Sequence, residues 1–155
     1  MLGRAPRGPY EVVLTDPAGW PVVIRNAPVL DDGTPMPTMY WLVGKQECRA
    51  VDYLEASGGV AAAEKAVDAE ELASAHRRYA EQRDAAVPSE WPGPRPSGGV
   101  GGARRGVKCL HAHYAWWLVG GDDPVGRWVA ERLKAGGMGE GLATRAAPRA
   151  TWAGL

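Results

Sequence analysis

Residues 109–121 form the longest strongly apolar stretch of this 155-residue chain. The stretch is interrupted by His111 and His113, and it is shorter than the ~20 residues that a membrane-spanning helix needs. A segment that is apolar on every side has to be buried. We therefore expect residues 107–119 to form a central helix around which the rest of the chain packs, with a short strand over residues 107–111 as the alternative.

The length of the chain suits one hydrophobic core. We expect a single domain over residues 1–135, a Gly- and Pro-rich loop at 87–106 within it, and a flexible tail at 136–155 whose isolated Trp152 buries little. The 18 basic residues equal the 18 acidic residues in number, which argues against nucleic acid or an anionic membrane as a partner. Residues 1–8 are basic but precede no apolar signal segment, so we expect a cytoplasmic protein.

Local patterns predict an α+β fold, in which a small antiparallel N-terminal sheet packs on about four helices. Two β-rich runs, 10–14 and 21–24, flank the turn sequence Asp16-Pro17-Ala18-Gly19 and favour a hairpin, and residues 38–43 suit a third strand. Helices are expected at 45–56, at 60–86 as one helix or as two with a break near Asp68, at 107–119, and at 124–135 after the N-cap residue Asp123.

One of the two cysteines and two of the three histidines lie within residues 108–113. In a helix, Cys109 and His113 share a face, as two ligands of one metal must, while His111 lies on nearly the opposite side; in a strand all three share a face. Our candidate metal ligands are therefore Cys109 and His113, with Cys48 as a third that is brought in from the first predicted helix.

The same residues fit other roles. Cys109, activated by His111 or His113 and with its pKa lowered by Lys108, is a candidate thiolate nucleophile. A cysteine on a helix that is apolar all round is instead expected to be a buried, inert hydrophobe. His113 equally suits packing against neighbouring tryptophans with its ring nitrogens bonded to backbone, and Cys48 falls on the apolar stripe of its own helix.

Residues 97–108 form a basic, glycine-rich loop that leads into the predicted central helix. Backbone amides and the helix dipole favour an anion at such a helix start. Arg104, Arg105 and Lys108, together with His111, are candidate ligands for a phosphate group through charge and bidentate hydrogen bonding. The loop matches neither nucleotide-binding fingerprint, and a flexible, solvated loop is the alternative.

Five segments occur in an order typical of one protein family: LGRAPRG at 2–8, DGTPMPTMYWL at 32–42, LEASG at 54–58, VKCLHAH at 107–113 and DPVG at 123–126. Over about residues 2–133 the chain resembles domain-of-unknown-function family 501. The resemblance implies an uncharacterised protein of actinobacterial type, from a family often encoded near a septum-formation initiator.

The resemblance also has a consequence for zinc binding by this chain. Relatives carry a Cys-Pro-Cys-Gly-like turn where this chain has residues 16–19, and a Thr-Cys-Pro where it has residues 43–45. A zinc shell built on those cysteines is incomplete here, and Cys48, an acid such as Asp16 or a water would supply the missing ligands. Two functions remain: a non-catalytic binding or accessory protein for a phosphorylated small molecule or a protein partner, and a Cys/His- or metal-dependent enzyme acting on a phosphorylated or acyl substrate.

Overall fold

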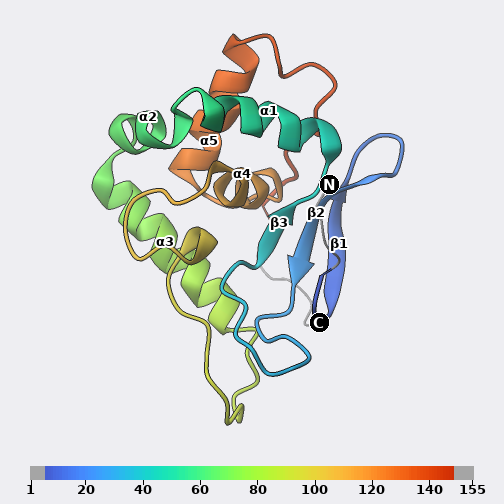
Figure 1. Cartoon of the computed structure of the whole chain (residues 1–155), viewed down its shortest axis with the longest axis vertical. Coiled ribbons are helices and arrows are strands. Elements are labelled where there is room, and N and C mark those ends of the chain that lie inside the picture. The colour runs from blue at the N-terminus through green and yellow to red at the C-terminus, as the bar shows by residue number, and fades with distance from the viewer. Residues whose placement is uncertain (1–5, 149–155) are drawn as a thin grey trace.

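The structure is a computed structural model that describes residues 6–148; the predictions for residues 1–5 and 149–155, Trp152 among them, lie outside the described residues. It confirms the α+β fold (Figure 1). The strands are β1 (Tyr10–Thr15), β2 (Pro21–Asn26) and β3 (Tyr40–Leu42). The helices are α1 (Lys45–Ala56), α2 (Gly59–Ala66), α3 (Ala69–Asp84), the single 3-10 turn η1 (Val100–Gly102), α4 (Leu110–Leu118) and α5 (Pro124–Ala135).

The three strands form an antiparallel sheet in the order β1-β2-β3, as predicted. The hairpin between β1 and β2 closes because Asp16 Oδ1 accepts hydrogen bonds from the backbone N–H groups of Ala18 at 2.9 Å and Trp20 at 2.8 Å. Gly19 adopts a φ of 88°, which glycine does without strain. Residues 22–24 of β2 are buried, and this places the sheet against the helices.

Helix α4 lies at the centre of the molecule and packs against β3, α1 and α5 (Figure 1). It begins at Leu110, so the predicted start at residue 107 is wrong by three residues. Cys109 has extended φ and ψ angles of −155° and 125° and is the N-cap. The free N–H of Leu110 donates to Glu55 Oε1 of α1 at 2.7 Å. Because this capping group comes from a residue far away in the chain, no local pattern marks the helix start.

Helices α2 and α3 are separate, which decides between the two predicted alternatives. The break occurs at Asp68, whose side chain accepts a hydrogen bond from the N–H of Glu71 at 2.9 Å and caps α3. Helix α5 begins as predicted: Asp123 Oδ1 accepts hydrogen bonds from Val125 at 2.9 Å and Gly126 at 3.2 Å.

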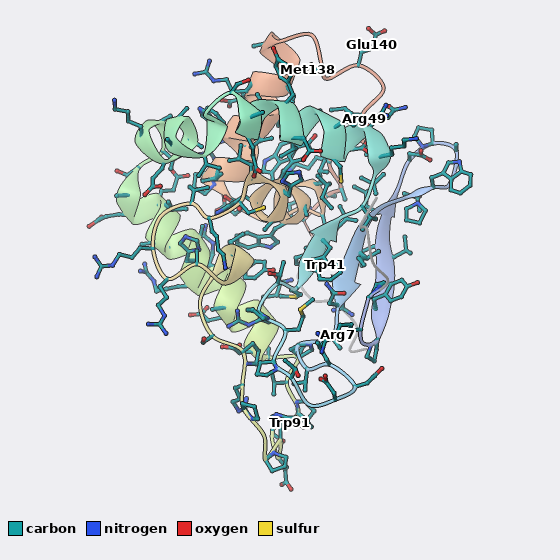
Figure 2. All side chains as sticks on the ribbon, viewed as in Figure 1. Arg7, Trp41, Arg49, Trp91, Met138 and Glu140 are labelled. Carbon is teal, nitrogen blue, oxygen red and sulfur yellow. The ribbon has the colours of Figure 1, made fainter. Side chains whose placement is uncertain are left out.

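Residues 87–106 contain no strand and no α-helix, only the turn η1. The loop runs out to Trp91, at the end of the molecule opposite Met138 (Figure 2). Its glycine-rich part is nevertheless fixed to α3. The buried Arg83 donates to the carbonyl of Gly98 at 2.8 Å, and His76 bonds to the loop backbone at two points. These contacts hold the backbone of the glycine-rich part against α3, while the side chains of Arg104 and Arg105 are exposed.

Residues 136–148, the described part of the predicted flexible tail, pack on the body. Ala143 is buried, and its N–H donates to the buried Glu47 of α1 at 2.9 Å. Arg145 donates to the carbonyls of Trp117 at 2.9 Å and Gly121 at 3.0 Å. The composition of this segment predicts a flexible tail. The segment is ordered by contacts with distant residues of the fold, and composition alone does not show such contacts. Within residues 6–148, none of the helices is long and apolar enough to cross a membrane.

Candidate functional site

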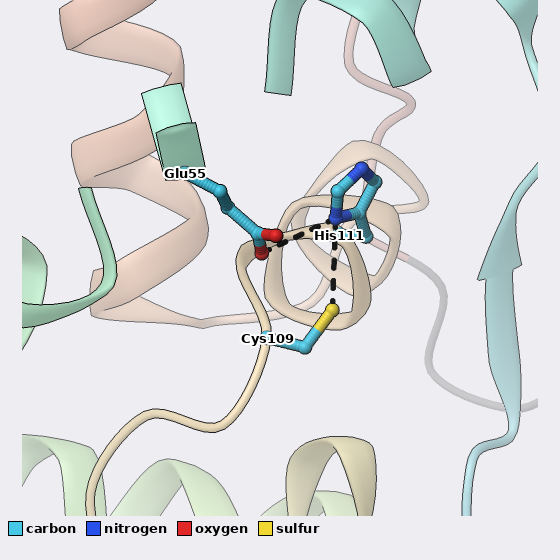
Figure 3. Close-up of side chains that lie close together, drawn as sticks. All are labelled: Glu55, Cys109 and His111. Carbon is cyan, nitrogen blue, oxygen red and sulfur yellow. Dashed lines mark hydrogen bonds and ion pairs between the residues drawn. The ribbon is translucent and has the colours of Figure 1, made fainter. Parts of the chain in front are cut away.

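Glu55, Cys109 and His111 bring a carboxylate, a thiol and an imidazole together where the end of α1 meets the start of α4 (Figure 3). His111 Nδ1 lies 3.6 Å from Cys109 Sγ and 3.2 Å from Glu55 Oε1. One ligand atom from each of the three residues lies within 4.8 Å of the other two, and all three residues are half-buried. The cluster is therefore accessible from solvent without being fully solvated.

The backbone around the cluster fixes its geometry. Cys109 is the N-cap of α4 and His111 is the second residue of that helix, so a single turn of chain sets their separation. Glu55 lies in the last turn of α1, where a helix dipole disfavours negative charge. Its hydrogen bond to the N–H of Leu110 places the carboxylate at the positive end of α4. The favourable interaction of the Glu55 carboxylate with the start of α4 thus offsets its unfavourable interaction with the end of α1.

A fourth residue, Asp52, completes the arrangement. Its Oδ1 lies 2.9 Å from His111 Nε2, so the imidazole bridges two carboxylates of α1 that are three residues apart and share one face. Burial lowers the pKa of His111, but the hydrogen bond and charge interaction with Cys109 and the carboxylate of Glu55 outweigh it and raise that pKa to about 9. Asp52 itself is exposed.

Two of the three distances within the cluster fit a tetrahedral metal site, and the third, between Cys109 and Glu55, is within 4.8 Å. With Zn–S, Zn–N and Zn–O bonds of about 2.3, 2.05 and 2.05 Å, tetrahedral geometry requires about 3.6 Å between sulfur and nitrogen and about 3.3 Å between nitrogen and oxygen. The structure has 3.6 Å and 3.2 Å. The position of Asp52 on the far ring nitrogen matches the carboxylate that commonly orients a metal-bound histidine. The set of sulfur, nitrogen and oxygen ligands suits zinc.

Two candidates from the sequence lie elsewhere. His113 is fully buried, and its Nδ1 is 2.7 Å from Asp123 Oδ2, while its Nε2 has no hydrogen-bond partner among the described residues. Cys48 donates to the carbonyl of Leu42 at 3.4 Å, and burial raises the pKa of its thiol. Because Cys109 precedes the helix, it is not in helical register with His113, and the expected pairing of these two residues does not form.

The predicted anion ligands are also divided. Arg104 and Arg105 line a pocket between the glycine-rich loop and α3, and both are exposed. Lys108 and His111 are not among the residues that line this pocket. Asp16, the acid considered as a metal ligand, uses its Oδ1 in the hairpin turn.

The sequence analysis missed Asp52 and Glu55, the two acids of the cluster. A signal was present: the two carboxylates are three residues apart on one helix face, and Glu55 belongs to the LEASG segment. That they meet His111 depends on how α1 packs on α4, which the local sequence does not encode.

The chain matches a known protein family. The family described as "Protein of unknown function (DUF501)" matches over residues 12–131, most of the chain, and this region contains Asp52, Glu55, Cys109 and His111. No curated protein and no solved structure matches the chain.

Proposed function

The chain belongs to the DUF501 family of proteins of unknown function, and from the geometry of the cluster we propose that it binds a zinc ion through Glu55, Cys109 and His111. The observation that carries this proposal is the spacing of His111 Nδ1 from Cys109 Sγ and from Glu55 Oε1, which agrees with two edges of a tetrahedral zinc shell to about 0.1 Å. The exposed Asp52 acts as the outer carboxylate that holds the His111 ring in place.

Three protein ligands leave the fourth position of a tetrahedral zinc ion open. Such a position takes a water molecule or an oxygen atom of a ligand, the arrangement typical of zinc sites with a chemical rather than a purely structural role. A phosphorylated or acyl compound has suitable oxygen atoms. The set differs from the one predicted from sequence, because Glu55 and His111 replace Cys48 and His113.

Metal analysis of purified protein tests this function. The protein is prepared without chelators and without an affinity column that carries metal, reconstituted with zinc, and freed of excess metal. We expect one zinc ion per chain in the wild type and in the control Cys48→Ser, which removes a thiol outside the cluster. Cys109→Ser and His111→Gln are expected to lose the ion. Glu55→Gln retains an oxygen for the N–H of Leu110 and is expected to weaken zinc binding without unfolding α4.

The outer carboxylate has its own test. Asp52→Asn should retain zinc with an affinity about 10- to 100-fold lower, measured by competition with a chromophoric chelator. A wild-type protein that takes up no stoichiometric zinc, or a Cys109→Ser variant that retains it, would contradict the proposal.

A second candidate function, a thiol nucleophile at Cys109, is favoured by one further observation. The groups form a chain from Cys109 Sγ to His111 Nδ1 and from His111 Nε2 to Asp52, at 3.6 and 2.9 Å. Such a Cys-His-acid series activates a thiol, and the start of a helix favours the thiolate. In metal-free protein we expect iodoacetamide to modify Cys109 faster than Cys48, and Asp52→Asn to slow that reaction. Equal rates at the two cysteines would exclude this candidate.

Both functions require a free Cys109, and the structure has both cysteines as free thiols. Free thiols persist in reducing compartments, which supports the cytoplasm as the place where the protein acts.

A further inference from the structure

A pocket of about 700 Å³ lies between α3 and the glycine-rich loop, with Glu64 of α2 also lining it. This volume falls within the range of small-molecule sites in proteins. Its walls are formed by Glu64, Ala69, Leu72, Ala73, His76, Arg77, Ala80, Gly98, Gly99, Ala103, Arg104, Arg105 and Gly106. Nothing in the zinc proposal uses this pocket, since Glu55, Cys109 and His111 do not line it.

Three arginines give the pocket its charge. Arg77 comes from α3, and Arg104 and Arg105 come from the loop; all three are exposed. None of them forms a hydrogen bond or ion pair with another residue in the range 6–148, whereas Arg7 and Arg127 pair with acids. Glu64 contributes the one carboxylate of the lining, so the pocket has a formal excess of two positive charges.

Most of the other residues that line the pocket have small or apolar side chains. Apart from His76 and Arg77, the α3 side consists of Ala69, Leu72, Ala73 and Ala80. Alanine side chains leave room for an organic group, and guanidinium groups bind phosphate with two parallel hydrogen bonds. The lining therefore matches a molecule with a phosphate at one end and a carbon skeleton at the other.

The loop that presents the arginines is held rigidly. His76 Nε2 bonds to the carbonyl of Gly106 at 2.8 Å, and the N–H of Val100 donates to His76 Nδ1 at 3.0 Å. Gly99 passes so close to the His76 ring that a side chain at this position would collide with it. A ligand therefore meets loop arginines whose backbone is already ordered, which lowers the entropic cost of binding.

We propose that this pocket binds a small phosphorylated organic molecule, with Arg77, Arg104 and Arg105 on its phosphate and the alanine-lined face of α3 against its carbon skeleton. The site is separate from the zinc cluster. It extends the anion-binding role of the loop to α3 and leaves out Lys108 and His111.

Calorimetric titration tests the pocket with phenyl phosphate, inorganic phosphate and phenol as probes. We expect phenyl phosphate to bind more tightly than inorganic phosphate, and phenol not to bind. Arg77→Gln, Arg104→Gln and Arg105→Gln should each lower the affinity for phenyl phosphate about tenfold. Arg49→Gln is the matched control, because Arg49 is an exposed arginine of α1 that does not line the pocket (Figure 2).

The outcomes separate this site from the zinc site. Cys109→Ser should bind phenyl phosphate as the wild type does, even when it has lost zinc. The proposal is overturned if the wild type binds neither phosphate probe, or if Arg49→Gln weakens binding as much as the pocket variants do.

Discussion

His76 has one ring nitrogen that donates a hydrogen bond and one that accepts. Nε2 faces the carbonyl of Gly106, and Nδ1 faces the N–H of Val100. Only the neutral ring with its proton on Nε2 satisfies both partners. Burial lowers the pKa of His76, and nearby His113 lowers it further against the effect of the Gly106 carbonyl. The ring therefore has to stay neutral for the loop to keep its place.

This requirement predicts a pH dependence of stability. In the unfolded chain His76 takes up a proton as the pH falls through about 6.5, whereas the folded protein takes it up only at lower pH. The contribution of His76 to the free energy of unfolding is therefore present above pH 6.5. It is lost as the pH falls from there through the lower pKa of the folded state.

Urea unfolding of the wild type and of His76→Gln at pH 8 and pH 5.5 measures this contribution. At pH 8 the variant should be less stable by roughly 1–3 kcal/mol, since it loses at least one buried hydrogen bond. At pH 5.5 the difference should be smaller. A difference that stays constant or grows on acidification would show that the ring is not held neutral.

At the scale of elements, α3 and α5 begin with the same type of cap in different surroundings. Asp68 caps α3 at the surface. Asp123 caps α5 in the interior, and its second carboxylate oxygen is 2.7 Å from the buried His113. The interior cap therefore also fastens α4 to α5.

This contrast predicts unequal effects of two matched variants. Asp68→Ala should cost about 1 kcal/mol, the usual loss of an N-cap. Asp123→Ala should cost about 3–5 kcal/mol, because it also leaves a buried histidine without its partner. Thermal and urea unfolding of both variants measure the difference. Equal losses would mean that the pair of Asp123 and His113 adds nothing beyond the cap.

The elements also show what the sequence predicts and why. The hairpin at 16–19, the break at Asp68 and the start of α5 were predictable because the residues that shape each of them are neighbours in the chain. The start of α4 was not, because its capping group, Glu55, comes from another helix. This affected the prediction of the metal ligands most, because the extended backbone at Cys109 brings its thiol to His111 instead of His113.

In the molecule as a whole, residues 136–148 pack against α1 and the end of α4. Arg145 donates to two backbone carbonyls near the end of α4, and its guanidinium lies 4.9 Å from the centre of the Trp117 ring. Arg145→Gln should therefore release this segment locally while the rest of the fold stays intact.

Limited digestion with proteinase K tests this release, with the cleavage sites located by mass spectrometry. Cleavage within residues 136–148 should be about tenfold faster in Arg145→Gln, which corresponds to roughly 1.4 kcal/mol of lost local stability. Arg49→Gln, with an exposed arginine of α1 replaced in the same way, should behave as the wild type. An unchanged cleavage rate in Arg145→Gln would show that other contacts hold the segment.

The fold brings the end of α1 and the start of α4 together at Glu55, Cys109 and His111, where we propose that a metal binds. Cobalt(II) substitution tests this metal site, because a Co–thiolate bond gives a near-ultraviolet charge-transfer band and a tetrahedral site gives strong visible bands. We predict both features in the wild type and in Cys48→Ser, and loss of the charge-transfer band in Cys109→Ser. A wild-type spectrum that is no different from that of cobalt in buffer, or a charge-transfer band that persists without Cys109, would show that Cys109 does not bind a metal here.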